Sequence, residues 1–149
     1  MKTTYPVSAL MQQKDLVLWS VGPQATVFDA IKLMAEKNIG ALLVLDGTEL
    51  LGVFTERDYT RKIALAGKSS RDTRVGDVMS GRVITVSPGD SVEDCMRLMT
   101  EHRIRHLPVV TGDKAVGIVS IGDLVNWTIS TQNAAIEQLE QYIAGSCAP

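Results

Sequence analysis

The sequence predicts an α+β fold, built from one β-α-β-β-α unit that occurs twice and is followed by a C-terminal helix. Three observations predict it. Segment 51–58 (LGVFTERD) recurs 65 residues later as 116–123 (VGIVSIGD). The alignment of 21–58 with 86–123 needs no insertion, and 13 of its 38 pairs are identical. Within each copy, apolar residues at helical spacing are followed by short continuous apolar runs that are typical of strands. Two units of this size are expected to share one core.

Length and composition favour a single globular domain that does not bind nucleic acid or membranes. The chain has 149 residues, a net charge of −2 and a pI near 5.6, so it has no basic footprint for nucleic acid. The apolar runs are too short to span a bilayer, and the first residues lack the apolar core of a signal peptide. We therefore expect a cytoplasmic protein. Cys95 and Cys147 are too few for a disulfide framework. Cys95 is expected to be a buried thiol, and the role of Cys147 stays open.

The chain begins with a lead-in segment, 1–16, for which we expect a short helix. The first repeat is predicted at 17–67. Thr26 has the side chain and position of an N-cap, and the apolar residues that follow it at helical spacing predict one buried stripe. Asn38 is predicted to end this helix.

The second half of the first repeat reads as a hairpin followed by a helix. The continuous apolar run 40–45 suits a strand buried on both faces. An Asp-Gly turn at 46–47 leads into a paired strand at 50–54. We expect the next helix to begin at Thr55, to include Leu65 and to end at Gly67.

A polar, charged segment at 68–74 is the predicted linker, and the second repeat is predicted at 75–128. Ser91 is the expected N-cap of its first helix. Strands are expected at 107–110 and 115–119, with a Gly-Asp turn between them.

The last segment, 129–149, is predicted to be a separate amphipathic helix and tail. Ile129, Ile136 and Ile143 recur every seven residues, which predicts one apolar face. That face is either an added layer on the same core or a contact between subunits.

A hydroxyl residue followed three positions later by an aspartate has two interpretations. It is the spacing of a helix cap, which needs no ligand. It also suits a ligand that carries both a phosphate and a vicinal diol, because the helix N-terminus attracts the anion and the carboxylate accepts from the diol. The spacing occurs at Thr26/Asp29, Thr55/Asp58, Ser91/Asp94 and Ser120/Asp123.

The duplicated unit with Gly, apolar residues, Ser or Thr and then Asp after its last strand resembles the cystathionine β-synthase (CBS) domain family. The resemblance covers about residues 15–128 and includes two further stretches, 75–79 (VGDVM) and 105–110 (RHLPVV). Segment 55–59 (TERDY) with a C-terminal helix is similar to small bacterial CBS-pair proteins that hold AMP and NAD-type nucleotides. The resemblance implies tandem repeats packed sheet to sheet about a pseudo-two-fold axis, with two clefts between them.

The resemblance also implies which residues bind a nucleotide. The aspartates would bind the ribose hydroxyls, and apolar residues would sandwich the adenine. Cleft one would combine Thr55, Arg57, Asp58 and Arg61 with Met79, Ile84, Ile104, Arg105 and His106. Cleft two would combine Ser120, Gly122 and Asp123 with Lys14, Trp19, Ile39, Gly40 and Ala41. Pro108 and Ile118 complete the predicted set.

The two clefts differ in charge. Cleft one gathers Arg57, Arg105 and His106, and arginine binds phosphate in a bidentate manner. We therefore expect it to prefer a compact mononucleotide such as AMP. Cleft two has Gly40 and Gly122 at matching positions, so it is expected to be roomier and to take the adenosine end of NAD(H). ATP and ADP are further candidate ligands for the pair of clefts. In the alternative interpretation, Arg57, Arg61 and Lys62 bind no ligand and are ordinary exposed charges of a helix.

Nothing in the sequence predicts catalysis. Ser120 has no histidine in its own motif, the Gly-x-Ser-x-Gly pattern is absent, and His102 and His106 have no further ligands that would complete a zinc site. The sequence thus predicts a regulatory module without catalytic cofactor or metal. It would signal through conformation or dimer packing to a homodimer partner or a separate effector protein. The alternative is a ligand-free interaction scaffold whose clefts are vestigial.

Overall fold

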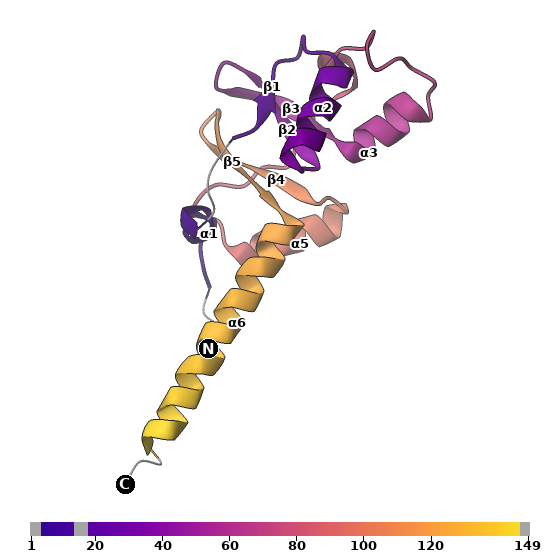
Figure 1. Ribbon diagram of the computed structural model, residues 1–149. Helices are drawn as coiled ribbons and strands as arrows, with labels where there is room; N and C mark the ends of the chain where they lie inside the picture. The colour runs from indigo at the N-terminus through magenta and orange to yellow at the C-terminus, as the bar shows by residue number, and fades with distance from the viewer. Residues whose placement is uncertain (1–3, 14–17, 147–149) are drawn as a thin grey trace.

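The computed structural model describes residues 4–13 and 18–146, and it confirms the predicted α+β fold of two repeats and a C-terminal helix. Within these ranges, one five-stranded sheet has the order β1-β2-β3-β5-β4 (Figure 1). No helix in the described part of the chain is long and apolar enough to cross a membrane. The elements are α1 (Val7–Gln13), β1 (Ser20–Val21), α2 (Val27–Lys37), β2 (Ala41–Asp46), β3 (Glu49–Thr55), α3 (Glu56–Tyr59), η1 (Thr60–Ala64), α4 (Val75–Val78), α5 (Val92–His102), β4 (His106–Thr111), β5 (Lys114–Ser120) and α6 (Ile121–Ser146).

The first helix of each repeat begins where the sequence predicts, and that of the first repeat also ends where predicted. The hydroxyl of Thr26 accepts from the backbone N–H of Asp29 at 3.1 Å, and Ser91 caps α5 in the same way. Asn38 ends α2 in the left-handed conformation, with φ of 53°, and Arg103 ends α5 with φ of 54°. The predicted caps are confirmed.

Strand β2 is buried on both faces, as predicted. Leu42 and Val44 point into the core of the first repeat, while Ala41 and Leu43 point into the core between the two repeats. Successive side chains of a strand alternate between faces, so one continuous apolar run serves both cores. This strand therefore fixes the first repeat against the second.

The two hairpins meet edge to edge at equivalent residues. Glu49 of β3 pairs with Lys114 of β5 in antiparallel fashion, and the two positions are 65 residues apart in the chain. The backbone N–H of Ala115 donates to the carbonyl of Thr48 at 3.2 Å. A residue that pairs with its own counterpart lies on a two-fold axis, so this contact marks the predicted pseudo-two-fold axis of the pair.

The lead-in helix α1 packs on the second repeat rather than the first. Its Val7 and Leu10 share a core with Val92 and Trp127. The backbone N–H of Val7 donates to the carbonyl of Asp90 at 2.7 Å. Sequence-distant segments therefore close the core of the second repeat.

The helix after Thr55 differs from the prediction at Leu65. Its second half, η1, is a π-helical turn, in which the N–H of Leu65 donates to the carbonyl of Thr60 at 3.0 Å. A π-helical turn inserts one residue and shifts the buried face. Ile63 is consequently 2% exposed, whereas Leu65 is 79% exposed and does not belong to the apolar stripe.

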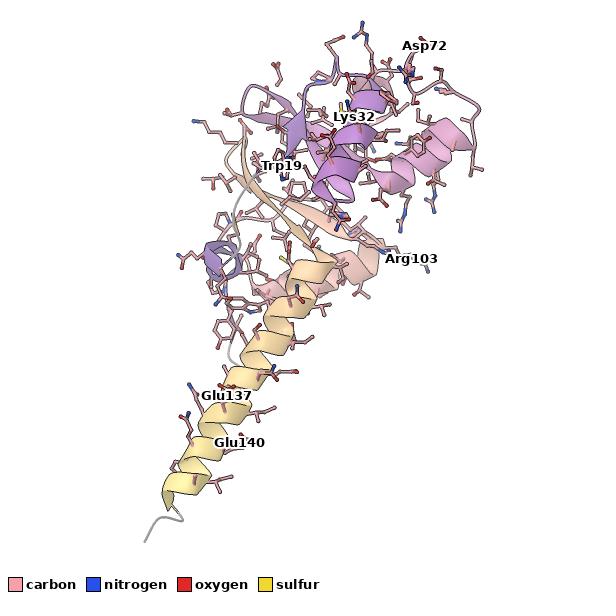
Figure 2. All side chains as sticks on the ribbon, viewed as in Figure 1. Trp19, Lys32, Asp72, Arg103, Glu137 and Glu140 are labelled. Carbon is pink, nitrogen blue, oxygen red and sulfur yellow. The ribbon has the colours of Figure 1, made fainter. Side chains whose placement is uncertain are left out.

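The C-terminal helix is not a separate segment. Helix α6 runs without a break through the predicted boundary at residue 128 and has 26 residues. Figure 1 shows its second half projecting from the rest of the molecule, and Glu137 and Glu140 lie on this projection in Figure 2. Ile129, Ile136 and Ile143 are 50%, 53% and 52% exposed, so this face is not an added layer on the core of its own chain.

Candidate functional site

Eight of the nine residues predicted around the first cleft line one cavity of about 670 Å³ between the repeats. The first repeat contributes the polar residues at the start of α3, and the second contributes the residues around the start of β4 and the segment that precedes α5. Pockets of this size hold drug-sized ligands. The eight residues are Thr55, Arg57, Asp58, Arg61, Ile84, Ile104, Arg105 and His106.

Two residues of the predicted set, Met79 of the first cleft and Pro108, lie away from this cavity. Met79 packs against the core of the first repeat, beside Gly52. Pro108 is buried within β4, where its carbonyl accepts from the backbone N–H of Val86 at 3.0 Å. Both positions are taken up by packing, so neither lines the cavity.

Asp58 lines the cavity and is also a helix cap. It is 6% exposed, and its Oδ2 accepts from the backbone N–H of Thr55 at 3.0 Å and from the Thr55 hydroxyl at 3.1 Å. Its Oδ1 accepts from the Ser80 hydroxyl at 3.1 Å and lies 3.0 Å from Nζ of Lys62. The backbone N–H of Asp58 donates in return to the Thr55 hydroxyl. The capping interpretation is therefore correct for this pair, and the carboxylate nevertheless borders the cavity.

Cations outnumber acids around the cavity. Glu56 and Asp58 are the acidic lining residues in the described part of the chain, against five lysines and arginines. Arg57 is held in place, because its Nη1 donates to the carbonyl of Arg103 at 2.7 Å in the second repeat. Such an excess of positive charge at a helix N-terminus favours an anionic ligand. The five cations are Arg57, Arg61, Lys62, Arg82 and Arg105.

The apolar part of the cavity comes from both repeats. Val53 at the end of β3 faces the same space as Ile84 and Ile104 of the second repeat. All three are partly or fully buried. An apolar wall of this kind suits an aromatic base, and the charged residues around it remain for polar groups.

The segment after α4 reaches the cavity because it pairs with β3. The backbone N–H of Val53 donates to the carbonyl of Ser80 at 3.1 Å, and the N–H of Ser80 donates to the carbonyl of Val53 at 2.9 Å. Gly52 allows this close approach, since a Cβ there would lie 2.6 Å from the Ser80 carbonyl oxygen. The pairing places the Ser80 hydroxyl on Asp58.

Several lining residues were not predicted for this cleft. Gly40 was assigned to the second cleft but lines the first, where a Cβ on it would lie 3.5 Å from both Glu56 and His106. Lys62 could have been found, because it follows Asp58 by four positions on one helix. The contacts of Arg82 and Ser80 depend on the fold and have no local signal. The unpredicted residues are Gly40, Val53, Glu56, Thr60, Lys62, Ser80, Arg82 and Val83.

The second hydroxyl and aspartate pair forms the same cap as the first. The backbone N–H of Ser120 donates to Oδ2 of Asp123 at 2.8 Å, and the N–H of Asp123 donates to the Ser120 hydroxyl at 3.1 Å. Gly122 is exposed beside this cap, and Cβ on it would lie 3.6 Å from the hydroxyl. The cap is thus conserved between the copies of the unit within this chain.

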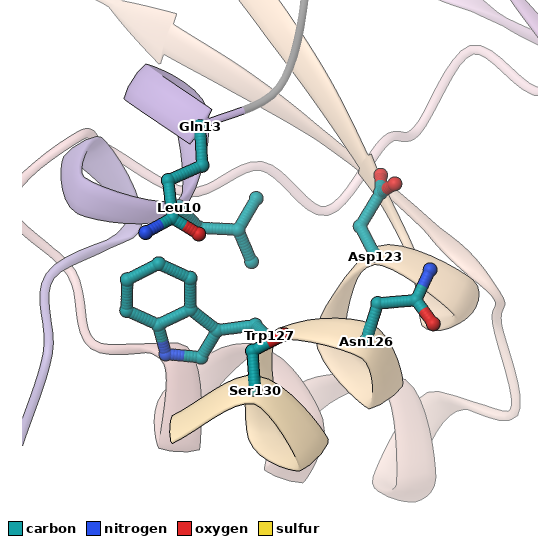
Figure 3. A pocket seen from close by; sticks show the side chains of 6 residues that line it. All are labelled: Leu10, Gln13, Asp123, Asn126, Trp127 and Ser130. Carbon is teal, nitrogen blue, oxygen red and sulfur yellow. The ribbon is translucent and has the colours of Figure 1, made fainter. Parts of the chain in front are cut away.

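The space at Asp123 is smaller than the sequence predicts. It is a cavity of about 230 Å³ between α1 and α6, and Figure 3 shows the indole of Trp127 lying beside Leu10 and Gln13 there. Trp127 occupies the position equivalent to Lys62, 65 residues later, and packs in the core with Leu10. A large side chain therefore fills the space that was expected to be roomier. Asn126 and Ser130 complete the lining.

The other residues predicted for the second cleft do not line this cavity. Trp19 packs on the core of the first repeat, with Nζ of Lys37 4.6 Å from its ring centroid. Ile39 packs on the same core, and Ala41 and Ile118 belong to the core between the repeats. Lys14 lies outside the described residues.

The resolved pKa shifts lie away from both cavities. Hydrogen bonds from Arg97 and Ser91 lower the pKa of Asp94 from its ordinary value. Burial raises the pKa of the Cys95 thiol to about 11. Among residues 4–13 and 18–146, no three histidine, cysteine or acidic side chains are grouped so that they would hold a metal ion.

Comparisons with known proteins agree on the family. The family model for the CBS domain matches residues 7–65 and 75–130. The mitochondrial CBS domain-containing protein CBSX3 of Arabidopsis thaliana is 45% identical over 125 residues, which are 80% of this chain and 61% of that protein.

Solved structures show the same relationship. A putative signal-transduction protein with CBS domains from Burkholderia ambifaria has a TM-score of 0.81 and 50% identity, over 87% of this chain and 96% of its own. CBSX2, solved in complex with AMP, has a TM-score of 0.72 and 27% identity, over 86% of this chain and 98% of its own. With two matches of the family model, each covering one copy of the repeated unit, the chain belongs to the CBS domain family as a tandem pair.

Proposed function

We propose that this protein is a non-catalytic regulatory module that binds adenine nucleotides, AMP above all, in the cavity at Asp58. One observation carries the proposal: a carboxylate at a helix N-terminus, a cationic rim and an apolar wall converge in one cavity of about 670 Å³. These are the three chemistries that a ribose diol, a phosphate and a base require. The complex of CBSX2 with AMP supports the choice of ligand.

The residues that line the cavity suggest an orientation for the nucleotide. The adenine would lie between Ile84 and Ile104, and the phosphate would face Arg61 and Arg105. Arginine offers paired N–H donors to phosphate oxygens, so a compact mononucleotide satisfies the rim. NAD(H), ADP and ATP share the adenosine part and are the competing ligands.

The test is calorimetric titration of ligand-stripped protein with AMP, ADP, ATP, NAD, NADH and S-adenosylmethionine. The Asp58→Ala variant should lose AMP binding at this cavity, and Asp123→Ala should report on the smaller cavity. Asp29→Ala is the matched control, since Thr26 and Asp29 have the same spacing at an exposed helix start. Full AMP affinity in Asp58→Ala would refute the assignment. No binding of any of these ligands to the wild-type protein would favour an interaction scaffold with vestigial cavities.

We further propose that α6 provides a contact through which the module meets a partner. The exposed residues Val125, Ile129, Ile136, Leu139 and Ile143 recur at spacings of four, seven, three and four, which match the heptad positions of a coiled-coil seam. A second copy of this chain is the partner that this seam suits, since the same residues would face each other across a two-fold axis. Nucleotide binding would act by favouring one packing of the pair over another. The cytoplasm remains the compartment that the sequence predicts.

A further inference from the structure

We propose that Lys62 determines specificity in the cavity: in the unliganded protein its ammonium takes the place of a ribose diol on Asp58, so that the cavity selects phosphorylated adenosine over adenosine. This inference rests on the proposed function, in which an adenine nucleotide binds at Asp58.

Lys62 holds Asp58 from within the same helical segment. Its Nζ lies 3.0 Å from Oδ1 of Asp58 and donates to the carbonyl of Val78 at 2.8 Å. The two residues are four positions apart, and such pairs face each other on a helix. The side chain of Lys62 is 41% exposed, whereas Asp58 is buried. The ammonium therefore closes the buried carboxylate from the side of the cavity.

The carboxylate of Asp58 has no acceptor capacity left for a diol. A carboxylate offers about four lone-pair sites. In the structure Oδ2 accepts from the backbone N–H and the hydroxyl of Thr55, and Oδ1 accepts from Ser80 and Lys62. A ribose diol brings two O–H donors, so at least one present donor must leave when the diol binds.

Lys62 is the donor that leaves most readily. The N–H and hydroxyl of Thr55 are part of the cap of α3, and two hydrogen bonds to Val53 hold the Ser80 backbone, so that the short Ser80 side chain stays beside Asp58. The ammonium of Lys62 sits on a flexible chain, and its displacement breaks no secondary structure.

The phosphate decides whether this displacement is compensated. Adenosine offers two hydroxyls to Asp58 but leaves the ammonium of Lys62 without an anion. AMP brings a phosphate into the cavity that Lys62 and Arg61 both line, so the ammonium gains a new partner. The second repeat has Trp127 at the position equivalent to Lys62, so the exchange of an ammonium for a ribose diol is possible only in the first repeat.

The test compares AMP, adenosine and 2′,3′-dideoxyadenosine by calorimetry on the wild-type protein, Lys62→Met and Lys62→Arg. Lys62→Met should bind adenosine roughly 2- to 5-fold tighter, the range that a part-exposed ion pair accounts for. It should bind AMP no tighter than the wild-type protein does. The ratio of AMP affinity to adenosine affinity should therefore fall. Dideoxyadenosine lacks the diol and should show no gain. Lys62→Arg keeps the cation and should keep the preference for AMP. Thermal melting of each variant verifies the fold.

The outcomes separate this inference from the proposed function. An unchanged ratio of adenosine to AMP affinity in Lys62→Met, with AMP binding still abolished by Asp58→Ala, would overturn the role of Lys62 alone. An equal gain for dideoxyadenosine would also overturn it, because the gain would then not come from the diol. A wild-type protein that binds no AMP would remove both proposals together.

Discussion

Gly52 lies against Ser80 so closely that a Cβ on the glycine would be 2.6 Å from the Ser80 carbonyl oxygen. The same contact brings the Ser80 hydroxyl to Asp58, at 3.1 Å. A missing side chain in β3 thus determines how the segment between the repeats reaches the cavity.

Replacing Gly52 with alanine should therefore destabilise the protein. The neighbouring atom is backbone, which cannot rotate away, and overpacking of this kind costs about 1–3 kcal/mol. The free energy of unfolding from urea titration measures the loss. Gly81→Ala is the control, because a Cβ there would have no neighbour within 4 Å. Equal stability of the two variants would contradict the argument.

Thr55→Val should weaken the start of α3. Valine keeps the shape of threonine but removes the hydroxyl that accepts from the N–H of Asp58 at 3.1 Å. Loss of an N-cap of this kind costs about 1 kcal/mol. Thr60→Val serves as the comparison, because its hydroxyl only donates to the Glu56 carbonyl on an exposed helix face. Chemical denaturation should show the larger loss for Thr55→Val, and the reverse order would speak against the cap.

The thiol of Cys95 should resist alkylation in the folded protein. Its pKa is raised from the ordinary value of 9.0 to about 11, mainly by burial and then by the charges of Asp90 and Asp94. Reactive thiolate is therefore scarce at pH 8. Mass spectrometry after iodoacetamide treatment, on a Cys147→Ser background, should show slow labelling that becomes fast in urea. Fast labelling without urea would contradict the burial of Cys95.

The same shift predicts how stability depends on pH. The folded state favours the protonated thiol of Cys95. The contribution of this thiol to the free energy of unfolding is therefore fully present below pH 9. It is lost as the pH rises from 9 towards about 11, where the unfolded chain releases the proton more readily. Cys95→Ala should lack this part of the pH dependence in unfolding curves measured across that window. An identical pH dependence in both proteins would contradict the prediction.

Charged substitutions on α6 should separate the subunits of the proposed dimer. Ile136→Glu and Ile143→Glu place carboxylates on the exposed apolar face, where a second copy would desolvate them. Light scattering after gel filtration should show the mass fall from dimer to monomer. Gln138→Glu adds the same charge outside the apolar seam and should leave the mass unchanged. An unaltered mass in the two isoleucine variants would exclude this face as the contact.

The sequence predicted what local patterns determine. Thr26, Ser91 and Asn38 mark helix ends through their own side chains and conformations, so both limits of α2 and the start of α5 were correct. The comparison of the two copies placed both hairpins, and the resemblance to the CBS domain family implied the eight residues that line the first cavity. The structure continues one helix across the expected boundary at residue 128, and no proline lies between Ile121 and Ser146 to interrupt it.

The rest depended on contacts between sequence-distant segments. Gly40 lines the first cavity because the residue directly before β2 lies beside His106 of the second repeat, which no local pattern records. The filling of the second cavity depends on how α1 packs on Trp127. The π-helical turn that exposes Leu65 changes the period of the helix itself, so a search for one fixed period cannot find it.

The antiparallel pairing of Glu49 in β3 with Lys114 in β5 relates this chain to a dimer of single repeats. A residue meets its own counterpart there, as residues do where two identical subunits form an isologous dimer. A polypeptide with one copy of the unit would offer the same strand edge and the same apolar face to a second identical polypeptide. A covalent link between the copies makes their association independent of protein concentration. It also lets equivalent positions diverge, so that one copy has Lys62 where the other has Trp127.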